Sequence, residues 1–380
     1  MGAGKREIRS DASARKPETD AERGPLHYGR RKMTRWYEHR FHNTTALRMI
    51  FAIMPRLPRF LHPPVARLTA LVFFLILKRE RQAVTKNLRR VTGKHGLALR
   101  WKVYCVFYSF CDLMVSYCFV PQATNAQLIG MLVNPDGGGA KIAECLRAGN
   151  GLIVWTAHVG NWEFASRLLA MYAQVNVARV VEEKPAEITL RNLMANERLK
   201  IVDLKRGVAA TIELLQALRR NEIVAMQGDR VYQRHACHVP FFSQPTSFPI
   251  GPFLLSQVSG APVLPAFMIR RGWLRYQVLM GDPIAAVSSA VRGGDGNAAL
   301  SVPMCHAVKF LEETLTTHCD QWMNFFDFWQ DAEEDVLIAD KTSERNSTCQ
   351  AQALRNKVSP EATTEAASSV KSPPGEFSAE

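Results

Sequence analysis

The sequence predicts an α/β protein whose mixed central sheet is flanked by helices. Short apolar runs alternate with segments in which apolar residues recur at helical spacing, a pattern typical of a sheet with helices on its faces. The chain has 380 residues, of which 47% are hydrophobic and 22% are charged, and this composition suits one sizeable globular domain with appendages. A basic N-terminal region precedes the predicted sheet.

The expected strands are short apolar runs, and the expected helices are longer segments with apolar residues three or four positions apart. The strands are residues 151–155, 175–180, 200–204, 223–227, 263–269 and 273–280. The helices are residues 100–120, 208–220, 252–258 and 303–317, together with one that begins near Trp162. An aromatic segment that ends at Trp329 follows the last helix.

The chain divides into four regions by composition. We expect residues 1–29 to be a disordered basic N-terminus, residues 30–95 a membrane-associating helical region, residues 96–330 the catalytic α/β domain, and residues 331–380 a disordered tail. No cleavable secretion signal opens the chain, and its eight cysteines contain no Cys-x-x-Cys pair. Both observations favour a cytosolic domain without a zinc ribbon or redox motif.

The positive charge is concentrated at the N-terminus. Residues 1–100 hold 23 Lys or Arg against 7 Asp or Glu, a net charge of +16, whereas the whole chain carries +13. The apolar segments 46–54 and 68–77 interrupt this charge and are shorter than the roughly 20 residues that cross a bilayer. We therefore expect a basic, amphipathic helical region at an anionic membrane surface, with a single short or tilted insertion as the alternative.

Nucleic-acid binding is the other interpretation of the same charge. The long apolar segments argue against it, and no zinc, helix-turn-helix or RNA-binding signature occurs. We expect no nucleic-acid partner.

The most informative segment of the chain lies where the first predicted strand ends. His158 follows that strand, and Glu163 comes five positions later. Residues five apart on one helix point roughly 140° away from each other, so His158 must precede the helix if the two side chains are to meet. Asn161 is then a plausible N-cap, and Glu163 can hold the imidazole tautomer as a base requires. The alternative is an ordinary helix end with a first-turn acid.

Four further blocks follow the histidine in a fixed order. They are residues 228–230, which read Gly-Asp-Arg, and residues 239–242, 248–252 and 260–267. Together they are a more specific signal than the His–Glu spacing alone.

In these blocks the chain resembles the bacterial lipid A late acyltransferases, within the wider lysophospholipid acyltransferase superfamily. The likeness runs from His158 through Trp329, with a weaker echo at residues 86–90. It implies a glycerolipid-acyltransferase-like fold in which His158 is the general base and Glu163 its partner. It also implies that an acyl group passes from a thioester to a lipid hydroxyl. The expected substrate-binding residues are Asn161, Asp229, Arg230, Pro249, Gly251 and Pro265.

Acyl transfer from a thioester needs a base, an orienting acid and a few hydrogen-bond donors, but no metal or cofactor. The donors expected here are backbone N–H groups after Gly160 or the guanidinium of Arg230, which could equally grip a phosphate. Acyl carrier protein or coenzyme A would carry the acyl chain as co-substrate. The cluster at His235, Cys237 and His238 is the one candidate for binding a metal, but its spacing is cramped for metal ligands and favours a loop beside a polar substrate.

The resemblance places the protein at the cytoplasmic face of the bacterial inner membrane, as a peripheral or monotopic enzyme of lipid A-like biosynthesis. Blocks 228–231 and 248–252 look closer to an uncharacterised branch of the superfamily than to the enzymes that acylate lipid A itself. Three alternatives stay open: a lipid acyl-ester hydrolase, an acyltransferase for another lipid such as a lysophospholipid or ornithine lipid, and a non-catalytic membrane-binding protein. No Gly-x-Ser-x-Gly motif supports the hydrolase.

Overall fold

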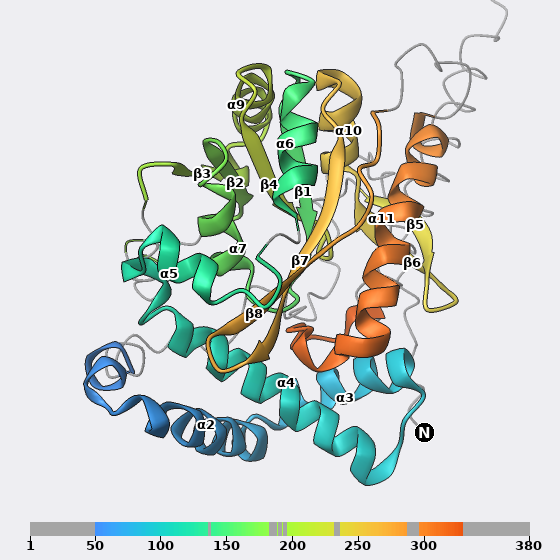
Figure 1. Ribbon diagram of the computed structural model, residues 1–380. Helices are drawn as coiled ribbons and strands as arrows, with labels where there is room; N and C mark the ends of the chain where they lie inside the picture. Colours follow the sequence, from blue (N-terminus) through green and yellow to red (C-terminus); the bar gives the residue numbers. More distant parts are fainter. Residues whose placement is uncertain are drawn as a thin grey trace, which may run out of the picture. The chain divides into compact units, whose positions relative to one another are not determined.

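The computed structural model describes residues 50–135, 138–181, 188, 192, 196–231, 236–286 and 296–329. The segments expected to be disordered, 1–29 and 331–380, lie outside the described residues, as do residues 30–49 of the basic region. Within the described residues, helices cover both faces of a central sheet (Figure 1). The predicted α/β class with a mixed central sheet is confirmed.

Six strands form this sheet in the order β3-β2-β4-β1-β7-β8. Their bounds are β1 (Leu152–Thr156), β2 (Val175–Arg179), β3 (Leu199–Asp203), β4 (Ile223–Gln227), β7 (Val263–Gly272) and β8 (Arg275–Met280). The first five in the spatial order are parallel, and β8 pairs antiparallel with β7. Each of these strands matches one predicted from the sequence to within a few residues.

The central strands β1 and β4 are apolar because helices bury them from both sides. The first four residues of each strand are buried, as parallel strands between two helical layers require. Helices α6 (Gly139–Arg147) and α7 (Trp162–Leu169) share a core cluster with residues of β1, β2, β4 and β7. Helices α9 (Val208–Arg219), α10 (Gly251–Ser259) and α11 (Gly296–His318) also pack on the sheet. On β7, Phe267 stacks on Phe310 of α11.

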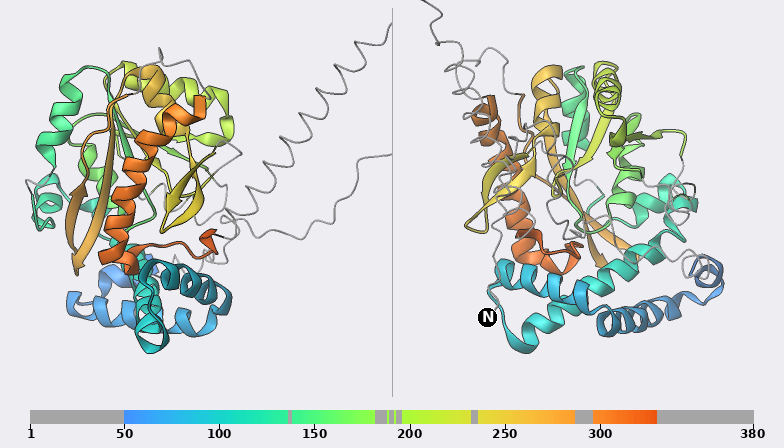
Figure 2. Two further views of the ribbon diagram at one scale, coloured as in Figure 1. Left: turned by 90° about the vertical axis from the view of Figure 1, so that its right-hand side faces the viewer. Right: turned by 180° about the vertical axis from the view of Figure 1, so that it is seen from behind.

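Three further helices form a separate layer, which lies below the sheet in Figure 1 and stays together in both views of Figure 2. They are α2 (His62–Ile76), α3 (Lys78–Thr92) and α4 (Gly96–Ser116), and α4 packs against both of the others. We call them the N-terminal helical layer. The predicted helix 100–120 corresponds to α4, which begins four residues earlier and ends at Ser116.

Several further helices are short. They are the 3₁₀ helices η1 (Met54–Arg56), η2 (Arg59–Leu61), η3 (Val120–Gln122), η4 (Leu204–Arg206) and η5 (Cys319–Gln321), and the α-helix α5 (Asn125–Gly130).

The sequence did not predict the two-stranded hairpin of β5 (Ala236–Phe241) and β6 (Gln244–Pro249). Proline cannot donate a ladder hydrogen bond, and three prolines in these strands hide the strand pattern. The structure tolerates them because the hairpin is separate from the main sheet, so both of its strands are edges. Pro240 and Pro245 face each other in the register.

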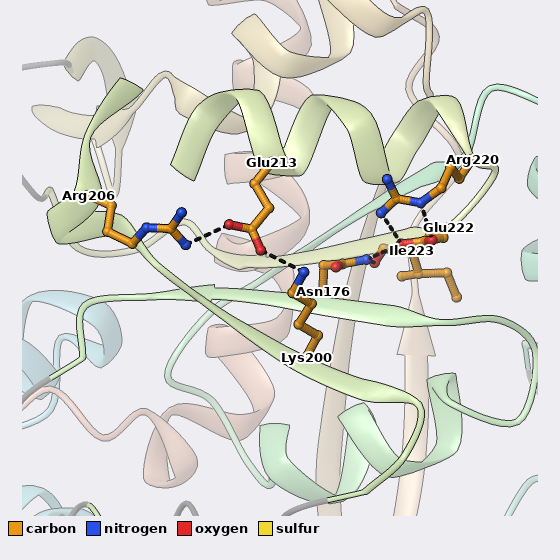
Figure 3. A network of polar contacts seen from close by, with 7 residues as sticks. All are labelled: Asn176, Lys200, Arg206, Glu213, Arg220, Glu222 and Ile223. Carbon is orange, nitrogen blue, oxygen red and sulfur yellow. Dashed lines mark hydrogen bonds and ion pairs between the residues drawn. The ribbon is translucent and has the colours of Figure 1, made fainter. Parts of the chain in front are cut away.

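A polar network ties α9 to the strands beneath it (Figure 3). Glu213 of α9 lies between Lys200, at 2.8 Å, and Arg206, at 2.7 Å. The second half of the network joins Glu222 to Arg220 at 2.6 Å and to the buried amide of Asn176 at 2.8 Å. These contacts anchor the start of β4 to β2, which helps to set the register of the sheet.

The loop after β1 depends on Gly160. Its φ is +66°, a conformation that favours glycine, and a Cβ atom there would lie 1.9 Å from the carbonyl oxygen of Met268. The N–H of Gly160 donates to the carbonyl of Gln321 at 3.0 Å, and that of Asn161 donates to Met268 at 2.8 Å. The loop is therefore held between β7 and the segment after α11.

We predict that Gly160→Ala is strongly destabilising, because it adds a backbone clash to an unfavourable positive φ. Gly149→Ala is the matched control: its φ is +79°, but a Cβ atom there meets no atom within 4 Å. The control should lose only the roughly 1–2 kcal/mol of a left-handed alanine, measured by chemical denaturation. Equal losses in the two variants would contradict the role of close packing at Gly160.

Candidate active site

Two side chains meet at the carboxyl edge of the sheet. The parallel partners β1 and β4 end in register, with Thr156 opposite Gln227. His158 and Asp229 each stand two residues beyond these positions, so both side chains emerge at the same edge. Nδ1 of His158 lies 2.7 Å from Oδ1 of Asp229, and we call this pair the dyad.

The hydrogen bonds of the dyad select one imidazole tautomer. Asp229 is 1% exposed, and its other oxygen, Oδ2, accepts the backbone N–H of His158 at 3.1 Å. An ionised carboxylate only accepts hydrogen bonds, so the ring proton must sit on Nδ1. The lone pair of Nε2 is then available for a proton from another molecule, and the His158 side chain retains 13% exposure.

A segment from the far end of the chain completes the surroundings of Asp229. Residues 322–328, which we call the strap, follow η5 and contribute two donors to Oδ2. They are Nε1 of Trp322 at 3.2 Å and Nδ2 of Asn324 at 3.1 Å. Because an unpaired buried carboxylate costs several kcal/mol, these donors are part of what keeps Asp229 ionised inside the protein.

The pKa values of the dyad move in a direction that suits a base. Burial lowers the pKa of His158, the nearby Arg230 lowers it further, and Asp229 opposes both; the result is a pKa of about 4. Burial alone would raise the pKa of Asp229, but His158 and Arg230 outweigh it and hold that pKa below its usual range. Near neutral pH the dyad is therefore a neutral imidazole beside an ionised carboxylate.

The prediction that Glu163 orients the imidazole is wrong in its geometry, because Asp229 occupies the Nδ1 position. The carboxylate of Glu163 instead lies 3.7 Å from the guanidinium of Arg179, at the end of β2. Glu163 sits in the first turn of α7, as expected, but from there it pairs with Arg179 of β2 and not with His158.

Asn161 caps α7 as predicted, and both polar atoms of its side-chain amide have hydrogen-bond partners within the protein. Its Oδ1 accepts from the N–H of Phe164 at 3.0 Å, while Nδ2 donates to Ser116 at 2.9 Å and to Tyr276 at 3.2 Å. Asn161 is buried, and all of its donors have partners inside the protein. The expected role of Asn161 in binding substrate is therefore replaced by a structural one.

Arg230 is also directed into the protein. Its Nε donates to Oδ1 of Asn324 at 2.8 Å, its Nη2 donates to the carbonyl of Met323 at 3.0 Å, and its guanidinium lies over the ring of Phe326. These contacts make Arg230 a brace of the strap. They do not support the expected role of Arg230 in binding a phosphate or stabilising an oxyanion.

The other expected pocket residues, Pro249, Gly251 and Pro265, lie on β6, α10 and β7. Pro265 is on β7, opposite Trp155 of β1. Pro249 ends β6, and Gly251 begins α10, where a Cβ atom would lie 3.8 Å from the side chain of Met226. Their role in binding substrate stays a prediction. Among the described residues, no cluster of three or more His, Cys, Asp or Glu side chains is arranged for a metal ion.

The sequence predicts no role for Asn324 or Asn87, and it predicts that Asp229 lies in the substrate pocket rather than beside the imidazole. A signal for Asp229 was available, because residues just beyond the carboxyl ends of two adjacent parallel strands meet. No sequence spacing relates Asn87 or Asn324 to the dyad. Their contacts arise only from the packing of the strap.

The fold and the dyad define an α/β protein with a His–Asp pair at the carboxyl edge of its sheet. A family model supplies the particular family: that of the bacterial lipid A biosynthesis acyltransferases matches residues 36–331. The chain belongs to this family and is an acyltransferase.

Mycobacterial proteins are among its relatives. The chain is similar to the phosphatidylinositol mannoside acyltransferase of two Mycobacterium tuberculosis strains, with 28% identity over 222 residues, 55% of this chain and 70% of the relative. The enzyme of the same name from Mycolicibacterium smegmatis is 28% identical over 125 residues, 32% of this chain and 41% of the relative.

We predict that His158 titrates well below the ordinary histidine pKa of about 6.5, with a midpoint of about 4 by NMR. A lowered pKa means that the neutral form persists as the pH falls and that protonation requires stronger acid. Asp229→Asn should move the midpoint lower still, because it removes the charge that favours the imidazolium. His158→Gln assigns the resonance. A wild-type midpoint at or above 6.5 would contradict this picture of the dyad.

Proposed function

We propose that this acyltransferase moves a fatty acyl chain from a thioester of acyl carrier protein or coenzyme A to a hydroxyl of a membrane glycolipid. The observation that carries the proposal is the dyad. Asp229 binds Nδ1 of a neutral His158, so the lone pair on Nε2 faces away from the carboxylate. Membership of the lipid A biosynthesis acyltransferase family and similarity to phosphatidylinositol mannoside acyltransferases support a glycolipid as the acceptor.

The proposed reaction uses Nε2 of His158 as a general base. The base takes the proton of the acceptor hydroxyl as that oxygen attacks the thioester carbonyl, which forms the new C–O bond. The carbon–sulfur bond of the resulting tetrahedral intermediate then breaks. The imidazolium returns its proton to the leaving thiolate, so the products are an ester and a free thiol.

Asp229 contributes in two ways to this reaction. It fixes the Nδ1–H tautomer, and it stabilises the imidazolium that forms while the proton is held. Since the pKa of Asp229 lies below its usual range, the carboxylate stays ionised throughout.

Acyl transfer should depend on the dyad far more than on Glu163. We expect His158→Ala to reduce kcat at least about 100-fold and Asp229→Asn to reduce it about 10²- to 10⁴-fold, since each removes the base or its tautomer control. Glu163→Gln serves as the matched control, because it removes only an ion pair with Arg179 and should cost much less. The measurement is transfer of a labelled acyl group from acyl-coenzyme A or acyl carrier protein to extracted membrane glycolipid.

Full activity in purified, folded His158→Ala protein would refute the proposal. A larger loss from Glu163→Gln than from Asp229→Asn would instead restore Glu163 as the partner of the base. Release of free fatty acid in place of acylated lipid would identify the alternative, a lipid acyl-ester hydrolase. Acylation of a lysophospholipid or ornithine lipid would identify another acceptor.

The proposed membrane contact is the outer face of α2. Residues His62, Ala66, Ala70 and Phe74 recur every four positions and are buried, and α2 packs on α4. Most of the rest of α2 is also apolar but exposed, with Arg67 as the charged exception. Its large exposed apolar residues are Val65, Leu68, Leu71, Val72, Leu75 and Ile76. A helix that is apolar on both sides needs a second apolar environment, and a membrane surface supplies one.

Neighbouring elements extend this face. On α4, Leu97 and Trp101 are exposed, and the ring of Trp101 lies 5.3 Å from that of Tyr104, which contacts α2. Next in sequence, α3 carries exposed basic residues at Lys78, Arg79 and Arg89, whereas Lys86 and Arg90 are turned toward Asp327 and Trp329. Each lysine or arginine near an anionic surface contributes roughly 1 kcal/mol to binding, so the combination suits a peripheral or monotopic protein at the cytoplasmic face of the inner membrane.

Within the part of the chain that the structure describes, two helical segments are long and apolar enough to span a membrane, namely residues 59–76 and 96–122. The second is mostly buried within the protein, as a core helix would be, whereas only 22% of the first is buried. We propose that the first, which contains α2, lies in the interface. Insertion of this segment remains the alternative.

The double substitution Leu71→Glu and Leu75→Glu should abolish binding to anionic vesicles, because it places two charges on the exposed face of α2. Val208→Glu with Ile212→Glu is the control, since these α9 residues are also exposed and apolar but lie outside the proposed contact. Flotation with phosphatidylglycerol vesicles measures binding. Equal flotation of the two double variants would argue against α2 as the contact.

A further inference from the structure

We infer that Asn87 is a positioning residue for the dyad: it holds the strap, and the strap in turn fixes the rotation of the Asp229 carboxylate. Asn87 lies on α3, in the N-terminal helical layer, and has no direct contact with His158 or Asp229. The inference rests on the proposed general-base function of His158.

The side-chain donors of the strap hold the Asp229 carboxylate against rotation. Oδ1 of Asp229 accepts from Nδ1 of His158, so rotation about the carboxyl group would spoil the alignment of the base. Two side-chain donors of the strap, from Trp322 and Asn324, bind the other oxygen and oppose that rotation. The orientation of the base therefore depends on where the strap lies.

The side chain of Asn87 holds the strap. The amide nitrogen of Asn87 donates to two strap carbonyls, those of Asn324 at 3.1 Å and Phe326 at 2.8 Å. Its Oδ1 accepts the N–H of Phe328 at 3.1 Å. One buried side chain thus makes three hydrogen bonds to alternate residues of the strap.

Hydrogen bonds hold both the backbone and the side chain of Asn324 in place. Asn87 binds its backbone carbonyl, and Arg230 binds its side-chain oxygen at 2.8 Å. The remaining polar atom of the side chain, the amide nitrogen, donates to Asp229. A shift of the strap by about 1 Å would move this donor directly, and misplacement on that scale can cost about 100-fold in rate.

The residue type at position 87 matters for the same reason. Asparagine supplies two donors and an acceptor on one short side chain, which matches the two carbonyls and one N–H of the strap. Aspartate has the same shape and keeps the acceptor, but it would set a carboxylate against two carbonyl oxygens. Asn87→Asp therefore tests the donors with little change in volume.

The adjacent residue offers a matched control. Lys86 also binds the strap, through an ion pair with Asp327 at 2.6 Å, but its side chain is 64% exposed. Exposed ion pairs contribute little, so Lys86→Gln should leave the strap in place. The two substitutions affect neighbouring residues of α3 and the same segment.

The experiment measures kcat and KM for Asn87→Asp and Lys86→Gln, each in the wild-type and the Asp229→Asn backgrounds, using the full chain and acyl-coenzyme A. We expect Asn87→Asp to lower kcat about 10- to 100-fold with little change in KM, and Lys86→Gln to leave both unchanged. In the Asp229→Asn background, Asn87→Asp should cost no more than about twofold, because its target is already lost. The downfield Nδ1–H resonance of His158 should weaken in the Asn87→Asp protein but not in the Lys86→Gln protein.

A merely structural role predicts the opposite pattern. The inference is overturned if Asn87→Asp retains kcat, or if its loss is equally large in both backgrounds. If Asn87→Asp does not fold, Asn87→Ser and Asn324→Leu replace it, with the same outcomes for and against. Failure of the proposed function is distinguishable, because His158→Ala would then keep its transfer activity whatever Asn87 does.

Discussion

The hydrogen bond between Asp229 and His158 is the interaction on which the rest of the site depends. A buried carboxylate is costly unless it is paired, and here the imidazole, a backbone N–H and two strap donors satisfy it. That arrangement sets the tautomer of His158 and leaves its second nitrogen free. The parallel register of β1 with β4 is what allows the two residues to meet, so the sheet itself assembles the dyad.

The dyad and the residues that hold it come from three distant parts of the chain. His158 and Asp229 come from the middle of the sequence, the strap comes from beyond α11, and Asn87 comes from α3. The N-terminal helical layer therefore does more than cover one end of the sheet. It carries the apolar face that we propose meets the membrane, and it also holds the segment that orients the base.

Most of the fold could be predicted from the sequence, because its signals are local. The strands of the main sheet are short apolar runs, and α9 and α10 follow helical spacing; all of them occur close to their predicted positions. The β5–β6 hairpin was missed, since its prolines obscure a pattern that only an edge position permits. His158 was identified as a candidate base because it follows a buried strand directly. Its partner was misassigned, because the five-residue spacing to Glu163 was the only relation visible along the chain.

The sequence by itself therefore determined the class of fold, the family resemblance and the histidine, all of which are encoded in neighbouring residues. Tertiary structure alone decided that Asp229 holds the imidazole, that Glu163 pairs with Arg179, and that Arg230 and Asn87 brace the strap. The physical reason is that hydrogen bonds act over about 3 Å in space, whatever the separation along the chain. Residues more than 200 positions apart become partners only when the sheet and the helical layer have packed.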